Sequence, residues 1–179
     1  MLSFNVAQLL KEGLGAFRHY ALSGELFDID VENPGPVFVQ GDLHLVRTPR
    51  GILAQGWAEA ALQQSCRRCL ALSETAVRLE IEEEFIPSVD IETGASLPIT
   101  DEDEAELVIN EHHILDVTEV LRQLAVVSVV NAGLCREDCK GLCPVCGANL
   151  NVEMCTCQKQ IGDPRLAILA QWLGSREDS

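Results

Sequence analysis

Eight cysteines are the residues with the clearest chemistry in this sequence of 179 residues. One pair stands near the middle of the chain, and six more follow after 65 cysteine-free residues: Cys66, Cys69, Cys135, Cys139, Cys143, Cys146, Cys155 and Cys157. Four thiolates complete the closed tetrahedral site that structural zinc prefers. Eight thiols therefore predict two structural zinc ions, with no open position at which a metal could activate water.

The spacing within the cluster supports metal binding. Cys143-Pro-Val-Cys146-Gly147 has the two-residue gap that lets one tight turn present two thiolates to the same ion, and the following glycine permits the unusual backbone angles of that turn. Cys66-Arg-Arg-Cys69 offers a second pair with the same gap. The first of these segments is predicted to be a zinc knuckle, and the second is a further candidate pair of ligands.

The sequence leaves the pairing of these thiols open. The simplest partition gives one ion to Cys143, Cys146, Cys155 and Cys157, and the other to Cys66, Cys69, Cys135 and Cys139. An alternative joins Cys135, Cys139, Cys143 and Cys146, so that Cys66 and Cys69 meet Cys155 and Cys157. Both partitions complete two four-thiol sites.

Other chemistries receive less support from the residues. A thioredoxin-like redox pair at Cys66 and Cys69 would need a strand-helix unit that does not plainly flank it, and an iron–sulfur cluster could use the same thiols. The adjacent His112 and His113 face different directions, and no phosphate-binding glycine loop or activated serine is recognisable. We therefore expect no enzymatic activity.

Alternating apolar and polar residues predict the strands that position these cysteines. The alternation covers residues 24–31, 36–46, 51–62 and 75–85, with turns at 33–36 and 48–51. These segments predict a meander of at least four antiparallel strands. The first 22 residues predict a short helix or an irregular arm, because glycines interrupt their helical spacing.

Two helices are expected after the strands. Residues 116–130 have Asp116 as a cap, Glu119 three residues on, and a stripe of Val117, Val120, Leu121, Leu124 and Val127. A closing helix is predicted between Asp163 and Gly174.

These elements predict an α+β fold: an antiparallel sheet curling toward a barrel, a covering helix, and a zinc-ribbon-like unit with a closing helix. We expect an α+β core domain over residues 1–134, with an acidic insertion at 80–111. Residues 135–179 are expected to form the cysteine-rich zinc-binding unit and the C-terminal helix.

The charge is concentrated in one segment. The chain has 28 acidic and 13 basic side chains, a net charge of −15, and twelve of the acidic residues but no Lys or Arg lie between residues 80 and 111. The segment is either a solvated face or a docking surface for a basic partner. The candidate partner-binding residues are Asp101, Glu102, Asp103, Glu104 and Glu106.

Basic residues gather beside the cysteines. Arg67, Arg68, Arg136 and Lys140 could form a local RNA-binding patch, although the overall charge opposes phosphate binding. Alternatively, they pair with neighbouring carboxylates. No run reaches the roughly 18 apolar residues of a membrane helix, and we expect the protein to reside in the cytosol.

Taken in order, these motifs resemble the YceD family. The resemblance rests on Cys66-Arg-Arg-Cys69-Leu, on Ile114-Leu-Asp116-Val-Thr-Glu119 and on Cys143-Pro-Val-Cys146-Gly-Ala-Asn149-Leu-Asn151 with its flanking cysteines. It implies a non-enzymatic factor needed for accumulation of the 23S ribosomal RNA, with a basic protein of the large ribosomal subunit or a precursor particle as a partner. The prolines usual before the first clustered cysteine are missing from residues 129–134.

Overall fold

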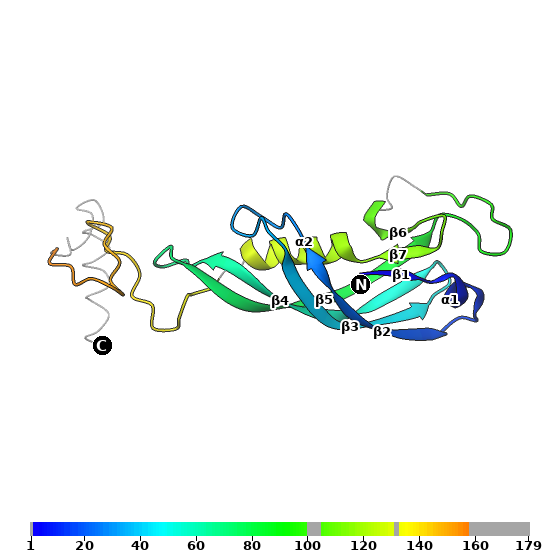
Figure 1. The fold of residues 1–179 in the computed structure, drawn as a ribbon, viewed down its shortest axis with the longest axis horizontal. Coiled ribbons are helices and arrows are strands. Elements are labelled where there is room, and N and C mark those ends of the chain that lie inside the picture. The colour runs from blue at the N-terminus through cyan, green and yellow to red at the C-terminus, as the bar shows by residue number, and fades with distance from the viewer. Residues whose placement is uncertain (1, 100–104, 131–132, 158–179) are drawn as a thin grey trace, which may run out of the picture. The chain divides into compact units, whose positions relative to one another are not determined.

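The computed structural model describes residues 2–99, 105–130 and 133–157 (Figure 1). The chain divides into two compact units: residues 1–66 with 71–135 form the first, and residues 67–70 with those from 136 onward form the second. The first unit carries the regular elements: β1 (Ser3–Asn5), α1 (Ala7–Lys11), β2 (Phe17–Leu26), β3 (Val37–Arg47), β4 (Ile52–Ser65), β5 (Leu72–Pro87), the short 3₁₀ helix η1 (Ala105–Leu107), β6 (Val108–Ile109), β7 (Ile114–Asp116) and α2 (Thr118–Val130).

A five-stranded sheet in the order β2-β3-β4-β5-β6 forms the body of the first unit. The pairings from β2 to β5 are antiparallel, which confirms the predicted meander, whereas β6 pairs with β5 in parallel and makes the sheet mixed. β1 and β7 form a separate two-stranded antiparallel sheet. In the described part of the chain β2 and β6 are the sheet's edges, so the sheet does not close into a barrel.

The strand expected at residues 24–31 was misplaced. β2 begins at Phe17, inside the segment expected to be a helix or an arm, and ends at Leu26. A loop follows, in which the Asp30 carboxylate accepts the backbone N–H of Asn33 at 2.8 Å. The buried Asn33 amide then pairs with both backbone groups of Gln63 at 2.8 and 2.9 Å. The Asn33 side chain thus makes the two hydrogen bonds to Gln63 that the backbone of a neighbouring strand would otherwise make. The chain after Leu26 is therefore a loop, although its residues alternate between apolar and polar.

Two glycines let β3 and β4 approach closely. A Cβ atom at Gly41 would collide with the backbone carbonyl of Trp57, and one at Gly56 would collide with the carbonyl of Asp42. Glycine inside a strand commonly marks such a close backbone approach. These positions therefore set the local geometry of the sheet.

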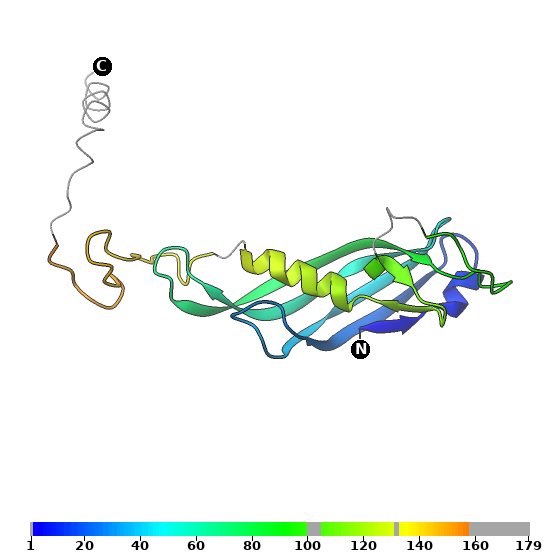
Figure 2. The same ribbon diagram turned by 90° about the horizontal axis from the view of Figure 1, so that it is seen from above.

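Helix α2 lies along one face of the sheet and contacts β2, β4 and β5 (Figure 2). Its predicted stripe is buried at Val117, Val120 and Leu121, and Leu124 packs against the same core. The prediction is wrong for Val127, which is 57% exposed. Among the described residues, no helix has both the length and the apolar character needed to cross a bilayer.

The start of α2 also differs from the expected capping box. The Asp116 carboxylate accepts the N–H of Thr118 at 2.8 Å. Glu119 accepts hydrogen bonds from Arg122 at 2.6 and 2.8 Å and does not reach back along the chain. The predicted closing helix at 163–174 lies outside the described residues.

Candidate metal centres

The segment from Cys143 to Ala148 folds as a tight knuckle. The N–H of Cys143 donates to the carbonyl of Ala148 at 2.8 Å, and the N–H of Gly147 donates back to the carbonyl of Cys143 at 2.9 Å. Gly147 has a φ of +75°, in the left-handed region that favours glycine. The turn also brings the N–H of Val145 to the Cys143 sulfur at 3.4 Å.

The segment from Cys66 to Ala71 repeats this geometry with a different sequence. The N–H of Cys66 donates to the carbonyl of Ala71 at 2.9 Å, the same five-residue span as in the first knuckle. Leu70 occupies the position of Gly147 and has a φ of +58°. A leucine there is strained, so the local structure holds this turn against its intrinsic preference.

The eight thiols gather into two groups of four. The first cysteine group consists of Cys66, Cys69, Cys135 and Cys139, and the second consists of Cys143, Cys146, Cys155 and Cys157. Within each group all four sulfur atoms lie within 4.8 Å of one another. This arrangement matches the simplest of the two partitions considered from the sequence, and each group could hold a metal ion.

The spacing of the sulfur atoms suits zinc. Four thiolates at about 2.3 Å from one tetrahedral ion lie roughly 3.8 Å apart. In the second cysteine group the Cys155 sulfur is 3.4 Å from that of Cys143 and 3.5 Å from that of Cys146. A hydrogen bond from the N–H of Cys157 to the Cys155 sulfur at 3.2 Å adds the support that metal-bound thiolates usually receive.

The thiols of the second cysteine group influence one another. Backbone N–H groups of Cys146 and Val145 lower the pKa of Cys143 to about 6, because they stabilise its thiolate. The neighbouring thiols of Cys155 and Cys146 raise the pKa of Cys157 to about 12. A divalent cation bound among the four sulfur atoms would stabilise all four thiolates together, since coordinating thiols are deprotonated outright. The donor set therefore fits a thiophilic ion such as zinc.

The Asn151 side chain makes hydrogen bonds to three residues of the segment from Arg136 to Lys140, and no role was predicted for it from the sequence. Its amide nitrogen donates to the Cys139 sulfur at 3.4 Å, and its amide oxygen accepts the backbone N–H of Lys140 at 2.8 Å and the Arg136 guanidinium at 2.9 Å. Asn149 accepts both the backbone and the side-chain N–H of Asn151. The two asparagines of the motif between Cys146 and Cys155, Asn149 and Asn151, are the feature of the sequence that could have indicated this hydrogen-bond network.

The four basic candidates lie in the second unit, which contains residues 67–70 and those from 136 onward. Arg68 donates to the carbonyl of Cys139 at 2.9 Å, and Arg136 pairs with Asp138 at 3.3 Å. Arg67 and Lys140 are exposed. The expected carboxylate pairing therefore holds for Arg136, whereas Arg68 supports the backbone of the first cysteine group.

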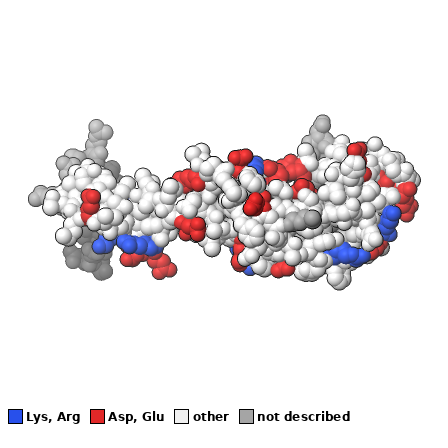
Figure 3. All heavy atoms as spheres, viewed as in Figure 1, with Lys and Arg blue, Asp and Glu red and all other residues white. Residues whose placement is uncertain are grey.

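The acidic candidates are only partly described. Asp101, Glu102, Asp103 and Glu104 lie outside the described residues, and Glu106 accepts a hydrogen bond from Gln123 at 2.7 Å. The structure adds Glu80, Glu82 and Glu84, which alternate along β5 on the side facing away from the core. Figure 3 shows acidic side chains distributed over much of the visible face.

Comparisons with known proteins place the chain in a family. A family model described as Large ribosomal RNA subunit accumulation protein YceD matches residues 54–173. Uncharacterized proteins from Mycobacterium bovis and Mycobacterium tuberculosis are 31% identical over 138 residues, which is 77% of this chain and 63% of theirs. The chain thus spans less than two thirds of the length of these curated relatives.

A protein of Arabidopsis thaliana named Large ribosomal RNA subunit accumulation protein YCED homolog 1, chloroplastic, is 35% identical over 49 residues, 27% of this chain and 15% of that protein. No solved structure matches significantly. The family model covers more than half of the sequence and includes both cysteine groups. The chain belongs to the YceD family.

Proposed function

We propose that this protein is a non-catalytic factor in biogenesis of the large ribosomal subunit, and that accumulation of the 23S ribosomal RNA depends on it. The observation that carries the proposal is the match of the family model to residues 54–173, under a description that names large ribosomal RNA subunit accumulation. The Arabidopsis relative has the same description in its name. The partner is a basic ribosomal protein or a precursor particle that contains one.

Two zinc ions, one in each cysteine group, have a structural role in this proposal. A closed four-thiolate site supplies folding free energy and offers no open coordination position for catalysis. Replacing Cys143 or Cys66 by serine is expected to lower the zinc content of the purified protein from two ions per chain to one. Elemental analysis of both variants measures this content, and an unchanged content in both variants would contradict the proposal.

The charge of the protein supports a basic partner. Complementary charge accelerates association and shields a basic client from nonspecific contacts with RNA. Removing the run from Asp101 to Glu106 is expected to weaken client binding, with the largest effect at low salt. Affinity that is unchanged across the salt range would exclude this segment as the contact.

The first test is depletion of the protein in cells, followed by measurement of the ratio of large- to small-subunit ribosomal RNA. A tagged copy is then purified at low salt, with and without nuclease. Depletion should lower the ratio, and a basic large-subunit protein should remain bound after nuclease treatment. An unchanged ratio would refute the proposed function.

A second candidate is direct contact with ribosomal RNA through Arg67, Arg68, Arg136 and Lys140. The observation that favours it is their membership of one unit, whose described residues carry four basic and three acidic side chains in an otherwise acidic protein. Replacing Arg67 and Arg68 by glutamate, with zinc content as the control, should then abolish retention of RNA. RNA binding that survives this change would exclude contact there.

A thiol redox or metal-delivery role is a third, less supported candidate. It requires exchangeable thiols, whereas Cys66 and Cys69 are 1% and 5% exposed. Rapid alkylation of either residue in the native metal-loaded protein would favour that role, and protection from alkylation would exclude it.

A further inference from the structure

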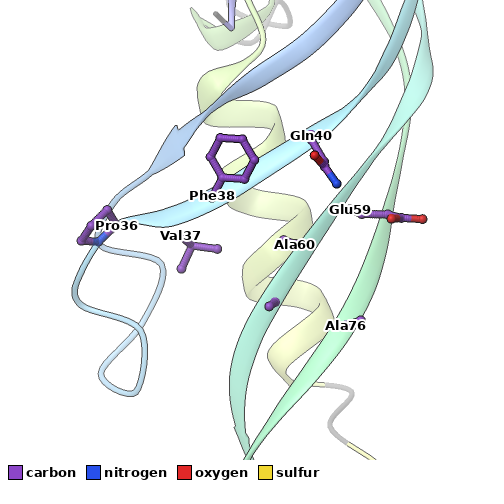
Figure 4. A pocket seen from close by; sticks show the side chains of 8 residues that line it. Pro36, Val37, Phe38, Gln40, Glu59, Ala60 and Ala76 are labelled. Carbon is purple, nitrogen blue, oxygen red and sulfur yellow. The ribbon is translucent and has the colours of Figure 1, made fainter.

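A hollow of about 360 Å³ opens on the side of the sheet that faces away from helix α2 (Figure 4). Phe38 and Gln40 rise from β3, and Glu59 rises from β4. Six of the eight lining residues are apolar; the full set is Pro36, Val37, Phe38, Gln40, Glu59, Ala60, Ala61 and Ala76. The hollow has room for one large aliphatic or aromatic side chain.

The register of the strands explains why the hollow forms at this place. The pairing of β3 with β4 ends at Val39 opposite Ala60, whereas β4 stays paired with β5 as far as Ser65 opposite Leu72. The sheet therefore parts beyond Val39, and the small side chains of Ala61 and Ala76, which lie opposite each other, leave space beside the opening. Phe38 is 55% exposed and forms one wall of the opening, so its ring is accessible to a bound side chain.

The side of the sheet on which the hollow opens is acidic, although Glu59 is the one carboxylate that lines the hollow and Glu84 is paired with Arg50 at 3.7 Å. Strand alternation places seven carboxylates and a single guanidinium, that of Arg78, on this side of β2 to β5; the carboxylates belong to Glu25, Asp42, Glu59, Glu74, Glu80, Glu82 and Glu84. Arg78 packs over the Trp57 ring at 4.3 Å. Nucleic acid would be repelled by this charge, whereas a lysine- and arginine-rich protein segment would be attracted.

We infer that the hollow receives an apolar side chain from a basic protein segment, whose flanking lysines and arginines face the surrounding carboxylates. This inference rests on the proposed function, which supplies a basic ribosomal protein as the partner. An apolar centre with a polar rim is the usual anatomy of a protein–protein interface. The hollow would hold the apolar side chain, and the carboxylates would attract the lysines and arginines on either side of it and fix the position of the segment along the sheet.

A double-mutant cycle tests the contact directly. The probe is a fluorescent peptide with a central leucine and three lysines or arginines on each side, and its companion peptide has glycine in place of leucine. Phe38→Ala is expected to weaken binding of the leucine peptide roughly fivefold to tenfold while affecting the glycine peptide little. Phe17→Ala is the matched control, since Phe17 is a 60% exposed aromatic residue on the same side of the sheet but outside the hollow.

Filling the hollow provides a second variant that should keep the fold. Ala61→Trp places a large ring in the space from an exposed position, and Ala21→Trp makes the same change at an exposed position on β2 away from the hollow. Only Ala61→Trp should abolish the preference for leucine over glycine. Circular dichroism of all four variants checks the fold.

Three outcomes would overturn the inference. Equal losses for the two peptides with Phe38→Ala would indicate charge attraction without an anchor contact. Equal effects of Phe38→Ala and Phe17→Ala would remove the hollow as the site. Direct binding of a labelled RNA hairpin in the absence of peptide, weakened by Phe38→Ala but not by Phe17→Ala, would make the ligand RNA.

The result is separable from the test of the proposed function. If the cycle shows no coupling but depletion still lowers the ribosomal RNA ratio, the inference fails and the function stands. If coupling is present and depletion has no effect, the hollow binds basic segments but the proposed function fails.

Discussion

Asn151 is a single residue on which the geometry around Cys139 depends. Its amide donates to the Cys139 sulfur and accepts from the Lys140 backbone, so it stabilises both the thiolate and the turn that carries it. Asn151→Asp keeps the acceptor but replaces the donor with a negative charge beside the sulfur. We expect roughly tenfold weaker zinc binding, measured by competition with a chromophoric chelator. Glu153→Gln, an exposed change in the same unit, should have no effect; equal affinities for the two variants would contradict this role of Asn151.

Leu70 and Gly147 occupy equivalent positions in the two knuckles but differ in backbone strain. Leu70 is 66% exposed, so Leu70→Gly should relieve the strain of its positive φ while losing little burial. We expect a gain of about 1 kcal/mol, equivalent to roughly fivefold tighter zinc binding at the first cysteine group. Gly147→Ala should cost a similar amount at the second group, since a Cβ there meets no atom within 4 Å and strain alone acts. Titrations with a chelator measure the zinc affinity of both variants, which should rise for Leu70→Gly and fall for Gly147→Ala. A change of affinity in the same direction for both would refute the explanation.

At the scale of elements, helix α2 is held to the sheet by the residues at its buried face. Leu121 is wholly buried, and Leu121→Ala should lower the free energy of unfolding of the first unit by about 3 kcal/mol, because it removes transfer free energy and leaves a cavity. Val127→Ala changes an exposed position of the same helix and should cost less than about 0.5 kcal/mol. Urea denaturation followed by far-ultraviolet circular dichroism measures both values. Similar losses would mean that α2 packs differently from this structure.

At the scale of the whole molecule, the two units owe their stability to different interactions. The buried apolar core lies entirely within the first unit. In the described part of the second unit the buried side chains are those of Cys69, Cys139 and Cys143. A segment with so little apolar burial needs a metal to fold.

Metal removal should therefore act on one unit only. After chelation, trypsin is expected to cleave rapidly at Arg136 and Lys140, whereas the β-sheet signal of the first unit persists. Mass spectrometry of the fragments and circular dichroism of the same samples provide the measurement, and re-addition of zinc before trypsin is the control. Loss of the sheet signal together with cleavage would show that the first unit also depends on the metal.

Local chemistry could be predicted from the sequence because it depends on residues close together in the chain. The knuckle at Cys143 and the pair at Cys66 and Cys69 follow from a two-residue gap between cysteines, the strands from alternating residues, and α2 from a helical stripe. The same reasoning misplaced β2, because the loop after Leu26 is fixed by a contact between Asn33 and Gln63, thirty residues apart. Family membership was also accessible, since its motifs are short and ordered.

The tertiary structure decided what depends on distant residues. Either partition of the eight thiols would complete the coordination of two ions. Only the path of the chain brings Cys66 and Cys69 to Cys135 and Cys139 across 65 intervening residues. The hollow beside Phe38 likewise arises where β3 leaves β4, at a point set by strand register and by the loop that Asn33 holds. Composition determined that the protein is acidic and rich in thiols; the pairing of strands determined which thiols meet and where an apolar opening lies among the carboxylates.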